Sequence, residues 1–156
     1  MPRIGVTGHV RLADGTAELV YAALSATLAT HDGPLHGVTC LADGADQLFA
    51  RAVAALGGTF EVVLPAADYR TVVDDRESFD DLLGKAIRVD YLPYARSDAA
   101  AYFAASDELL NRVDHLIAVW DGVASDVVSS TAHVVRTARD RGLPVTVIWP
   151  AGARRA

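Results

Sequence analysis

The sequence predicts an α/β fold, a single doubly wound domain in which a mostly parallel sheet of five or more strands carries helices on both faces. Short apolar stretches alternate with amphipathic helical stretches along the 156 residues. The links between them are short, which is typical of successive β-α-β units. Hydrophobic residues make up 51% of the chain, which excludes a disordered protein and is enough to build one core.

Six stretches have the composition of strands in such a sheet, and the fourth is expected at an edge. Parallel strands need crossover connections, and these should be right-handed. The predicted strands are Ile4–Val6, Leu35–Leu41, Phe60–Leu64, Arg88–Leu92, His115–Trp120 and Leu143–Trp149.

Five helices are predicted between these strands. Thr16 is expected to cap the first helix and Asp43 the second, with Asp46 as the reciprocal partner of a capping box. The polar stretch 66–76 is expected to be irregular, and residues 1–150 should form the domain with 151–156 as a frayed tail. The predicted helices are Thr16–Ala29, Asp43 to about Leu56, Ser78–Ala86, Ala99–Val113 and Ser129–Arg141.

Composition narrows the possible partners and compartment. The formal net charge is −6, which makes duplex nucleic acid a poor partner, because binding a duplex normally needs a basic face. No apolar run approaches the roughly 18 residues of a membrane helix, and the N-terminus lacks the layout of a signal peptide. Cys40 is the single cysteine, which fits a reducing compartment. We therefore expect a cytoplasmic protein with no membrane partner.

A ligand site is expected beyond the carboxyl ends of the strands, where the strand order reverses. If His115–Trp120 and the second strand flank the first strand on opposite sides, the reversal falls between His115–Trp120 and the first strand. Four polar segments that follow strands then meet in one crevice. They are Thr7-Gly8-His9, Asp43-Gly44-Ala45-Asp46-Gln47, Asp121-Gly122 and Ser129-Ser130-Thr131.

Each segment has a binding interpretation and a structural one. The hydroxyls and N–H groups of Ser129–Thr131 suit a phosphate or carboxylate, and equally suit plain N-capping. The carboxylates of Asp43 and Asp46 suit ribose hydroxyls or a base, or a capping box. Gly8 leaves room for a ligand against the backbone, or only forms a tight turn.

Three further side chains also have both a binding and a structural interpretation. His9 suits a phosphate contact or acid–base chemistry, or a structural hydrogen bond. Arg11 suits a phosphate, or is a solvated loop residue. Asp121 suits a hydroxyl or a metal, or closes a turn with Gly122.

No complete catalytic set is recognisable. The catalytic residues are unknown, with His9, Asp43 and Asp121 as candidates. The other histidines lack metal-ligand spacing and Cys40 has no cysteine partner, so neither a metal nor a cofactor is predicted. No G-x-S-x-G elbow and no Walker loop occurs.

Five segments, in this order, resemble the SLOG superfamily. They are Gly5-Val-Thr-Gly-His9, Ala42-Asp-Gly-Ala-Asp-Gln47, Val63-Leu-Pro65, Asp114-His-Leu-Ile-Ala-Val-Trp-Asp-Gly122 and Ser129-Ser-Thr-Ala132. That group has a Rossmann-like fold and includes the LOG phosphoribohydrolases, the lysine-decarboxylase-like proteins and the DNA-processing DprA branch. The chain is most similar to small bacterial members with a G-x-T-G-H-R turn. The resemblance implies a nucleotide or nucleotide-derived phosphorylated ligand, bound by the crevice residues named above.

The chain departs from the phosphoribohydrolase motif P-G-G-x-G-T-x-x-E. Ser129 and Ser130 stand in place of small glycines, and Val134 stands where the catalytic glutamate would fall. Arg11 comes one position later than the arginine of the G-H-R turn. General acid–base catalysis is typically worth ~10²–10⁴ in rate, so this departure argues against an efficient hydrolase of that kind.

Three functions follow from these residues. The first is a module that binds or senses a small nucleotide-type ligand. The second is a nucleoside 5′-monophosphate N-glycosidase that uses another carboxylate, and the third is a scaffold with a vestigial crevice. A homodimer through Ala99–Val113 is also considered, although burial within the monomer explains that helix equally well.

Overall fold

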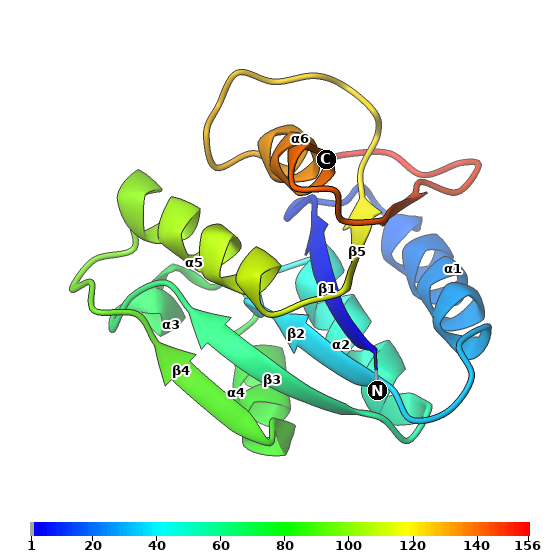
Figure 1. The fold of residues 1–156 in the computed structure, drawn as a ribbon, viewed down its shortest axis with the longest axis horizontal. Helices are drawn as coiled ribbons and strands as arrows, with labels where there is room; N and C mark the ends of the chain where they lie inside the picture. The colour runs from blue at the N-terminus through cyan, green and yellow to red at the C-terminus, as the bar shows by residue number, and fades with distance from the viewer. Residues whose placement is uncertain (1) are drawn as a thin grey trace.

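The computed structural model describes residues 2–156 and shows a six-stranded sheet in the order β4-β3-β2-β1-β5-β6 (Figure 1). Every neighbouring pair of strands is parallel. The predicted α/β fold is confirmed, the predicted edge strand is β4, and the strand order reverses between β1 and β5 as expected. The strands are β1 Arg3–Gly8, β2 His36–Thr39, β3 Thr59–Leu64, β4 Arg88–Tyr91, β5 His115–Val119 and β6 Val145–Ile148.

Helices cover both faces of the sheet (Figure 1). Helices α1, α2 and α4 pack on one face, around a core that includes Phe49, Phe60 and Phe79. Helices α5 and α6 pack on the other face, where Leu109 and Leu116 belong to a second core. The helices are α1 Thr16–Ala29, α2 Ala45–Ala55, α3 Tyr69–Val72, α4 Arg76–Lys85, α5 Ala99–Asn111 and α6 Thr131–Asp140.

The predicted caps of α1 and α2 are wrong. Both helices begin after a glycine with positive φ, Gly15 at 81° and Gly44 at 78°, and neither has a side-chain cap. Thr16 lies inside α1, and its hydroxyl oxygen accepts a hydrogen bond from the N–H of Arg154 at 3.0 Å. A glycine in this conformation turns the chain sharply into the helix and leaves the neighbouring polar side chains free for other contacts.

Two segments expected to be irregular are ordered. The polar stretch 66–76 contains the short helix α3. The segment 151–156, expected to be frayed, returns to the β1–α1 connection, where the N–H of Ala13 donates to the carbonyl of Arg154 at 2.9 Å and Leu12 forms a bridge with Arg155. Backbone hydrogen bonds of this kind are not visible in composition, which is the only basis of the tail prediction.

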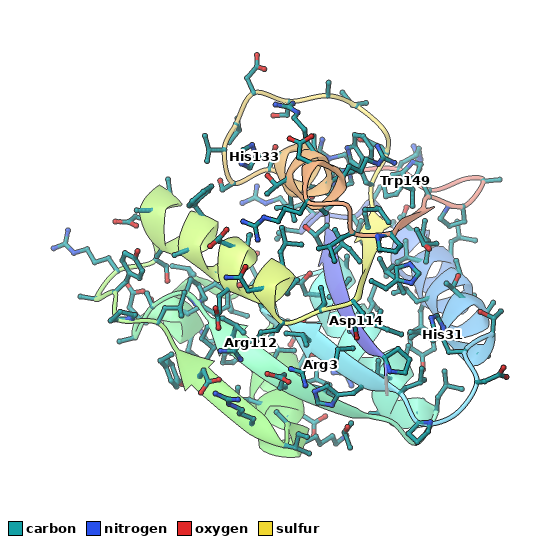
Figure 2. All side chains as sticks on the ribbon, in the orientation of Figure 1. Arg3, His31, Arg112, Asp114, His133 and Trp149 are labelled. Atoms are coloured by element: carbon teal, nitrogen blue, oxygen red, sulfur yellow. The ribbon has the colours of Figure 1, made fainter. Side chains whose placement is uncertain are left out.

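A cluster of charged side chains lies at the amino-terminal ends of the strands. Glu61 of β3 is 3% exposed and accepts hydrogen bonds from Arg3 and from Arg112, the latter at 2.9 Å. His36 Nε2 lies 2.7 Å from the same carboxylate, and the N–H of Arg3 donates to Asp114 at 3.0 Å. Figure 2 shows Arg3, Arg112 and Asp114 close together at this end of the strands. The cluster links the end of α5 to β1, β2 and β3, at the end of the strands opposite the expected ligand site.

No helix within residues 2–156 combines the length and the apolar character needed to cross a membrane.

Candidate functional site

A cleft of about 350 Å³ lies beyond the carboxyl ends of β1, β2 and β3. Its volume falls within the roughly 300–1,000 Å³ typical of small-molecule sites, and its place matches the general rule for open α/β sheets. The strands supply its floor, and helices α3, α5 and α6 supply its walls. It is lined by Val6, Thr7, Gly8, Val10, Cys40, Ala42, Asp43, Asp46, Pro65, Tyr69, Val72, Val73, Tyr102, Ala105, Ser106, Leu109, Ser129, Thr131 and Val134.

Six of the fourteen predicted site residues line this cleft. They come from three of the four predicted segments, which the fold therefore brings together as expected. The six are Thr7, Gly8, Asp43, Asp46, Ser129 and Thr131. The other eight are His9, Arg11, Gly44, Ala45, Gln47, Asp121, Gly122 and Ser130, and they do not line it.

The turn at the end of β1, around Gly8 and His9, packs against α2 and β5. A Cβ at Gly8 would overlap the side chain of Ala45 and would lie 2.8 Å from Cβ of Val119. The N–H of Ala45 donates to the carbonyl of His9 at 3.2 Å, and a Cβ at Gly44 would meet that same carbonyl oxygen at 2.6 Å. Gly44 and Ala45 thus hold the turn in place and do not face the cleft.

The loop between β2 and α2 holds most of its own polar groups. Asp43 accepts hydrogen bonds from the N–H groups of Asp74 at 2.8 Å and Asp75 at 3.1 Å, so it anchors the α3–α4 connection. Gln47 is 6% exposed and its Nε2 donates to the carbonyl of Leu41 at 3.3 Å. Leu41 adopts a φ of 53°, an unusual value for a bulky residue and one that tends to occur near functional sites.

Asp46 differs from Asp43 because its carboxylate keeps free hydrogen-bonding capacity. It is 7% exposed and accepts a hydrogen bond from the N–H of Ala42 at 3.3 Å through Oδ2. Burial raises the pKa of Asp46 to about 7, although hydrogen bonds from the backbone of Ala42 and Cys40 lower it in part. Asp46 therefore titrates near neutral pH inside the cleft.

An aromatic and aliphatic wall completes the cleft. The rings of Tyr69 in α3 and Tyr102 in α5 meet edge-on, with centroids 6.3 Å apart. Burial raises the pKa of the Tyr69 phenol, and the nearby Asp46 carboxylate raises it further. Burial also raises the pKa of the Cys40 thiol, so Cys40 is not a reactive thiolate. No sequence motif marks these residues, although Tyr69 follows β3 by only a few positions, which could have suggested a role.

The start of α6 forms another wall of the cleft. Ser130 is the N-cap, its Oγ accepting from the N–H of His133 at 3.2 Å and donating to the carbonyl of Val127 at 2.7 Å. The N-capping alternative is therefore correct for Ser130. Ser129 and Thr131 line the cleft on either side of it. The positive end of the helix dipole and these two hydroxyls suit an anion.

His9 and Asp121 lie together outside the cleft. The Nε2 atom of His9 accepts a hydrogen bond from the N–H of Asp121 at 3.1 Å, and the ring packs edge-on against Trp149 with centroids 5.4 Å apart. Asp121 Oδ1 also lies 3.3 Å from this nitrogen, a contact that becomes an ion pair only if His9 is protonated. Burial and the nearby Arg155 lower the pKa of His9, more than Asp121 raises it, so the neutral ring that accepts the amide is favoured.

The remaining predicted residues have structural or solvent-exposed positions. Asp121 Oδ1 accepts from the N–H of Val123 at 3.0 Å across Gly122, which has a φ of 83°. The turn alternative is thus correct for this pair. Arg11 is exposed, and its carbonyl accepts from the N–H of Ala156 at 3.2 Å.

The charge of the cleft follows from its lining. Asp43 and Asp46 supply two carboxyl groups, and no arginine, lysine or histidine is present among the lining residues. Within residues 2–156, no group of three or more histidine, cysteine, aspartate or glutamate side chains could hold a metal ion. The cleft therefore offers aromatic and aliphatic contacts, hydroxyl donors, a helix N-terminus, and the carboxyl group of Asp46, which has free hydrogen-bonding capacity.

Comparisons place this fold among known structures. No protein-family model and no curated protein matches the chain. The structure is similar to DNA processing protein A from Streptococcus pneumoniae, with a TM-score of 0.73 and 17% identity over 97% of this chain and 52% of that one. The chain thus spans about half the length of that protein.

Two further solved structures are similar. DNA processing protein A from Helicobacter pylori, described for its single-stranded DNA binding mode, gives a TM-score of 0.70 with 13% identity over 99% of this chain and 68% of that one. The structural-genomics target TM1055 gives a TM-score of 0.62 with 19% identity over 93% of this chain and 72% of that one.

These comparisons correct the predicted partners. The predicted partner is a small nucleotide-type molecule, with duplex nucleic acid excluded and single-stranded nucleic acid not included. The Helicobacter pylori protein of the same fold binds single-stranded DNA. The physical reason is that net charge describes the whole surface, whereas single strands are held by local grooves and by aromatic side chains that stack on bases. The chain therefore shares its Rossmann-like fold with DNA processing protein A.

Proposed function

We propose that the chain is a binding module that holds a nucleotide unit in the cleft. The observation that carries this proposal is the joint lining of one 350 Å³ cleft by the Tyr69–Tyr102 pair and by the start of α6. A nucleotide has one aromatic and one anionic end, and the cleft offers a matching surface for each. The nucleotide unit can come from a free nucleotide or from single-stranded DNA, since both carry the same base, sugar and phosphate.

The two ends of the nucleotide have different expected positions. The phosphate belongs at Ser129 and Thr131, where the helix dipole and hydroxyl donors favour a negative charge. The base belongs at Tyr69 and Tyr102, where aromatic contact is worth roughly 1–3 kcal/mol per base. The reverse orientation would place the phosphate away from the start of α6, at an end of the cleft where no lining residue carries a positive charge.

Binding without turnover is favoured over hydrolysis. The side chain that lines the cleft at the position expected for the catalytic glutamate is that of Val134. Of the three catalytic candidates, His9 and Asp121 lie outside the cleft and Asp43 holds the α3–α4 connection. Asp46 remains as the one lining carboxyl group that is not bound to another loop.

Thermal unfolding in the presence of nucleoside 5′-monophosphates, ADP-ribose and a short oligothymidylate tests this proposal. A ligand that binds the folded state at about 100 times its Kd stabilises the protein by roughly 2.7 kcal/mol, which raises Tm by several degrees. Preference for the mononucleotides identifies a free nucleotide as the source, and preference for the oligonucleotide identifies single-stranded DNA. No shift with any of these compounds contradicts the proposal.

Two matched variants assign the effect to the cleft. Ser129→Trp places a large ring in the cleft and should abolish the shift in Tm. Val128→Trp changes the adjacent, exposed residue, which does not line the cleft, and should leave the shift intact. Release of free base from a nucleoside monophosphate, followed by chromatography, separates binding from hydrolysis, and stoichiometric binding without release is the expected result.

A further inference from the structure

The charges in the cleft also determine how ligand binding depends on pH. We infer that Asp46 must carry a proton for the cleft to hold an anionic ligand, so that binding takes up one proton from solution. This inference rests on the proposed function, because it concerns the same cleft and a ligand with a phosphate group. In this inference, the protonation state of Asp46 determines whether the cleft can bind an anion.

The first support is the position of the carboxyl group. Asp46 lies in the first turn of α2, is 7% exposed and lines the cleft. Its hydrogen bond from the N–H of Ala42 is long, at 3.3 Å, and uses Oδ2 alone. The backbone of Cys40 also lowers the pKa of Asp46, but burial outweighs both backbone contacts, so a negative charge at Asp46 is poorly stabilised by the protein.

The second support is the set of groups that face Asp46. Cys40 at the end of β2, Asp43 in the following loop, Tyr69 of α3 and Tyr102 of α5 are the titratable side chains in the cleft around it. All four are neutral or negative in their ordinary states, and none can supply a positive charge. The lining contributed by β1, β3 and α6 is uncharged.

A charged Asp46 and a bound phosphate would therefore repel each other without a compensating cation. Inside a cleft of low effective dielectric this repulsion is larger than at a surface, and protonation of the carboxyl group removes it. The pKa of Asp46, raised to about 7 by burial, already makes that protonation easy near neutral pH. Ligand binding should raise the pKa of Asp46 further, and the linked equilibrium draws one proton into the complex.

The neutral carboxyl group also changes from an acceptor into a donor. Once protonated, Asp46 can donate a hydrogen bond to an acceptor atom of the ligand, such as a ring nitrogen or a carbonyl oxygen of a base. The same proton thus removes the repulsion and adds a contact.

The test measures Kd for adenosine 5′-monophosphate between pH 5.5 and 8.5 with the wild-type chain and with Asp46→Asn. The ratio of the two Kd values cancels the titration of the ligand's own phosphate, whose second pKa is about 6. Between pH 7.5 and 8.5, the wild-type Kd should rise close to tenfold relative to the variant. Asp32→Asn removes an exposed carboxylate of the α1–β2 connection and should keep the wild-type pH dependence.

Calorimetry supplies an independent measurement on the wild-type chain alone. Titration of adenosine 5′-monophosphate at pH 8 in two buffers of different ionisation enthalpy should show uptake of about one proton per bound ligand. Uptake close to zero would overturn the inference even if the Asp46→Asn chain fails to fold. Equal pH dependence of the wild type and Asp46→Asn would overturn it as well.

The outcomes also separate this inference from the proposed function. Binding that is independent of Asp46 and of pH above 7 contradicts the inference and leaves nucleotide binding intact. Absence of binding at every pH for the ribonucleoside monophosphates, ADP-ribose and the oligothymidylate contradicts both, and if only the oligothymidylate binds, the same pH series is measured with it.

Discussion

Gly8 at the end of β1 and Ala45 at the start of α2 approach so closely that no side chain fits between them. A Cβ at position 8 would also lie 3.0 Å from the carbonyl oxygen of Val119. This contact fixes the distance between the β1 turn and α2. Gly8 is therefore required for the packing of β1 against α2, whether or not a ligand also approaches its backbone.

We expect Gly8→Ala to destabilise the chain, because overpacking of a tight contact typically costs about 1–3 kcal/mol. Denaturant unfolding at neutral pH measures the change. Gly84→Ala is the matched control, because Gly84 lies in α4 with open space around its Cβ position. That change should stabilise the chain by roughly 0.5–1 kcal/mol, since alanine is the better helix former. Equal effects of the two variants would contradict the role of the Gly8–Ala45 contact.

Asp46 should make the protein less stable as the pH rises. Its folded-state pKa of about 7 lies above the ordinary value of 3.8, so its contribution is fully present below pH 4 and is lost as pH rises through 7. Asp46→Asn escapes this loss and should exceed the wild type in stability at pH 8 by up to about 4 kcal/mol. The difference in unfolding free energy should shrink toward zero near pH 4. A variant that is less stable at pH 8 would show that the carboxylate is held by contacts that favour its charge.

The apolar strands and the helical periodicity of the chain predict the fold well, because a parallel sheet buried on both faces leaves a strong pattern in sequence. The predicted reversal between β1 and β5 also agrees with the position of the cleft, since it depends only on strand order. Thr7, at the end of β1, and Asp46, at the start of α2, both line the cleft at this reversal.

The side chains that complete the cleft were not predictable in the same way. Tyr69 comes from the short helix α3 and Tyr102 from the first turn of α5, and no motif marks either residue. Their convergence depends on how the two helices pack, which the periodicity of either one does not determine. His9 and Asp121 show the opposite case, because both follow strands but contact each other outside the cleft, where His9 also packs against Trp149.

Removal of Arg112 should be costly, because it leaves Glu61 buried with less charge compensation. The guanidinium donates to Glu61 and to Asp90, both at 2.9 Å, and its side chain is 14% exposed. Breaking a buried ion pair at one partner typically costs about 3–5 kcal/mol, and we expect Arg112→Met to lie near the lower limit. Arg70→Met is the control, because its ion pair with Asp80 is exposed and worth at most about 1 kcal/mol. Similar losses of unfolding free energy in the two variants would contradict this assignment.

The same cluster should make the chain sensitive to acid. Burial alone would raise the pKa of Glu61, but the hydrogen bonds from His36 and Arg112 and the charge of Arg3 outweigh it and lower the pKa. The stability that Glu61 contributes is present above its ordinary value of 4.5 and is lost as pH falls through the lowered folded value. The free energy of unfolding should therefore decline below pH 4.5, and less steeply in Glu61→Gln. Parallel acid profiles for the two chains would show that other carboxyl groups cause the decline.

Ser130 and Thr131 are adjacent but should respond differently to alanine. Ser130 caps α6 through its Oγ, so Ser130→Ala should destabilise the chain by about 1 kcal/mol. Thr131 lines the cleft, so Thr131→Ala should change stability little. A hydrogen bond from its hydroxyl to a phosphate is worth about 1.5–3 kcal/mol, so this variant should weaken binding of a nucleoside monophosphate by roughly tenfold or more. Unfolding and binding measured on both variants separate the two roles, and a loss of binding confined to Ser130→Ala would place the anion at the cap instead.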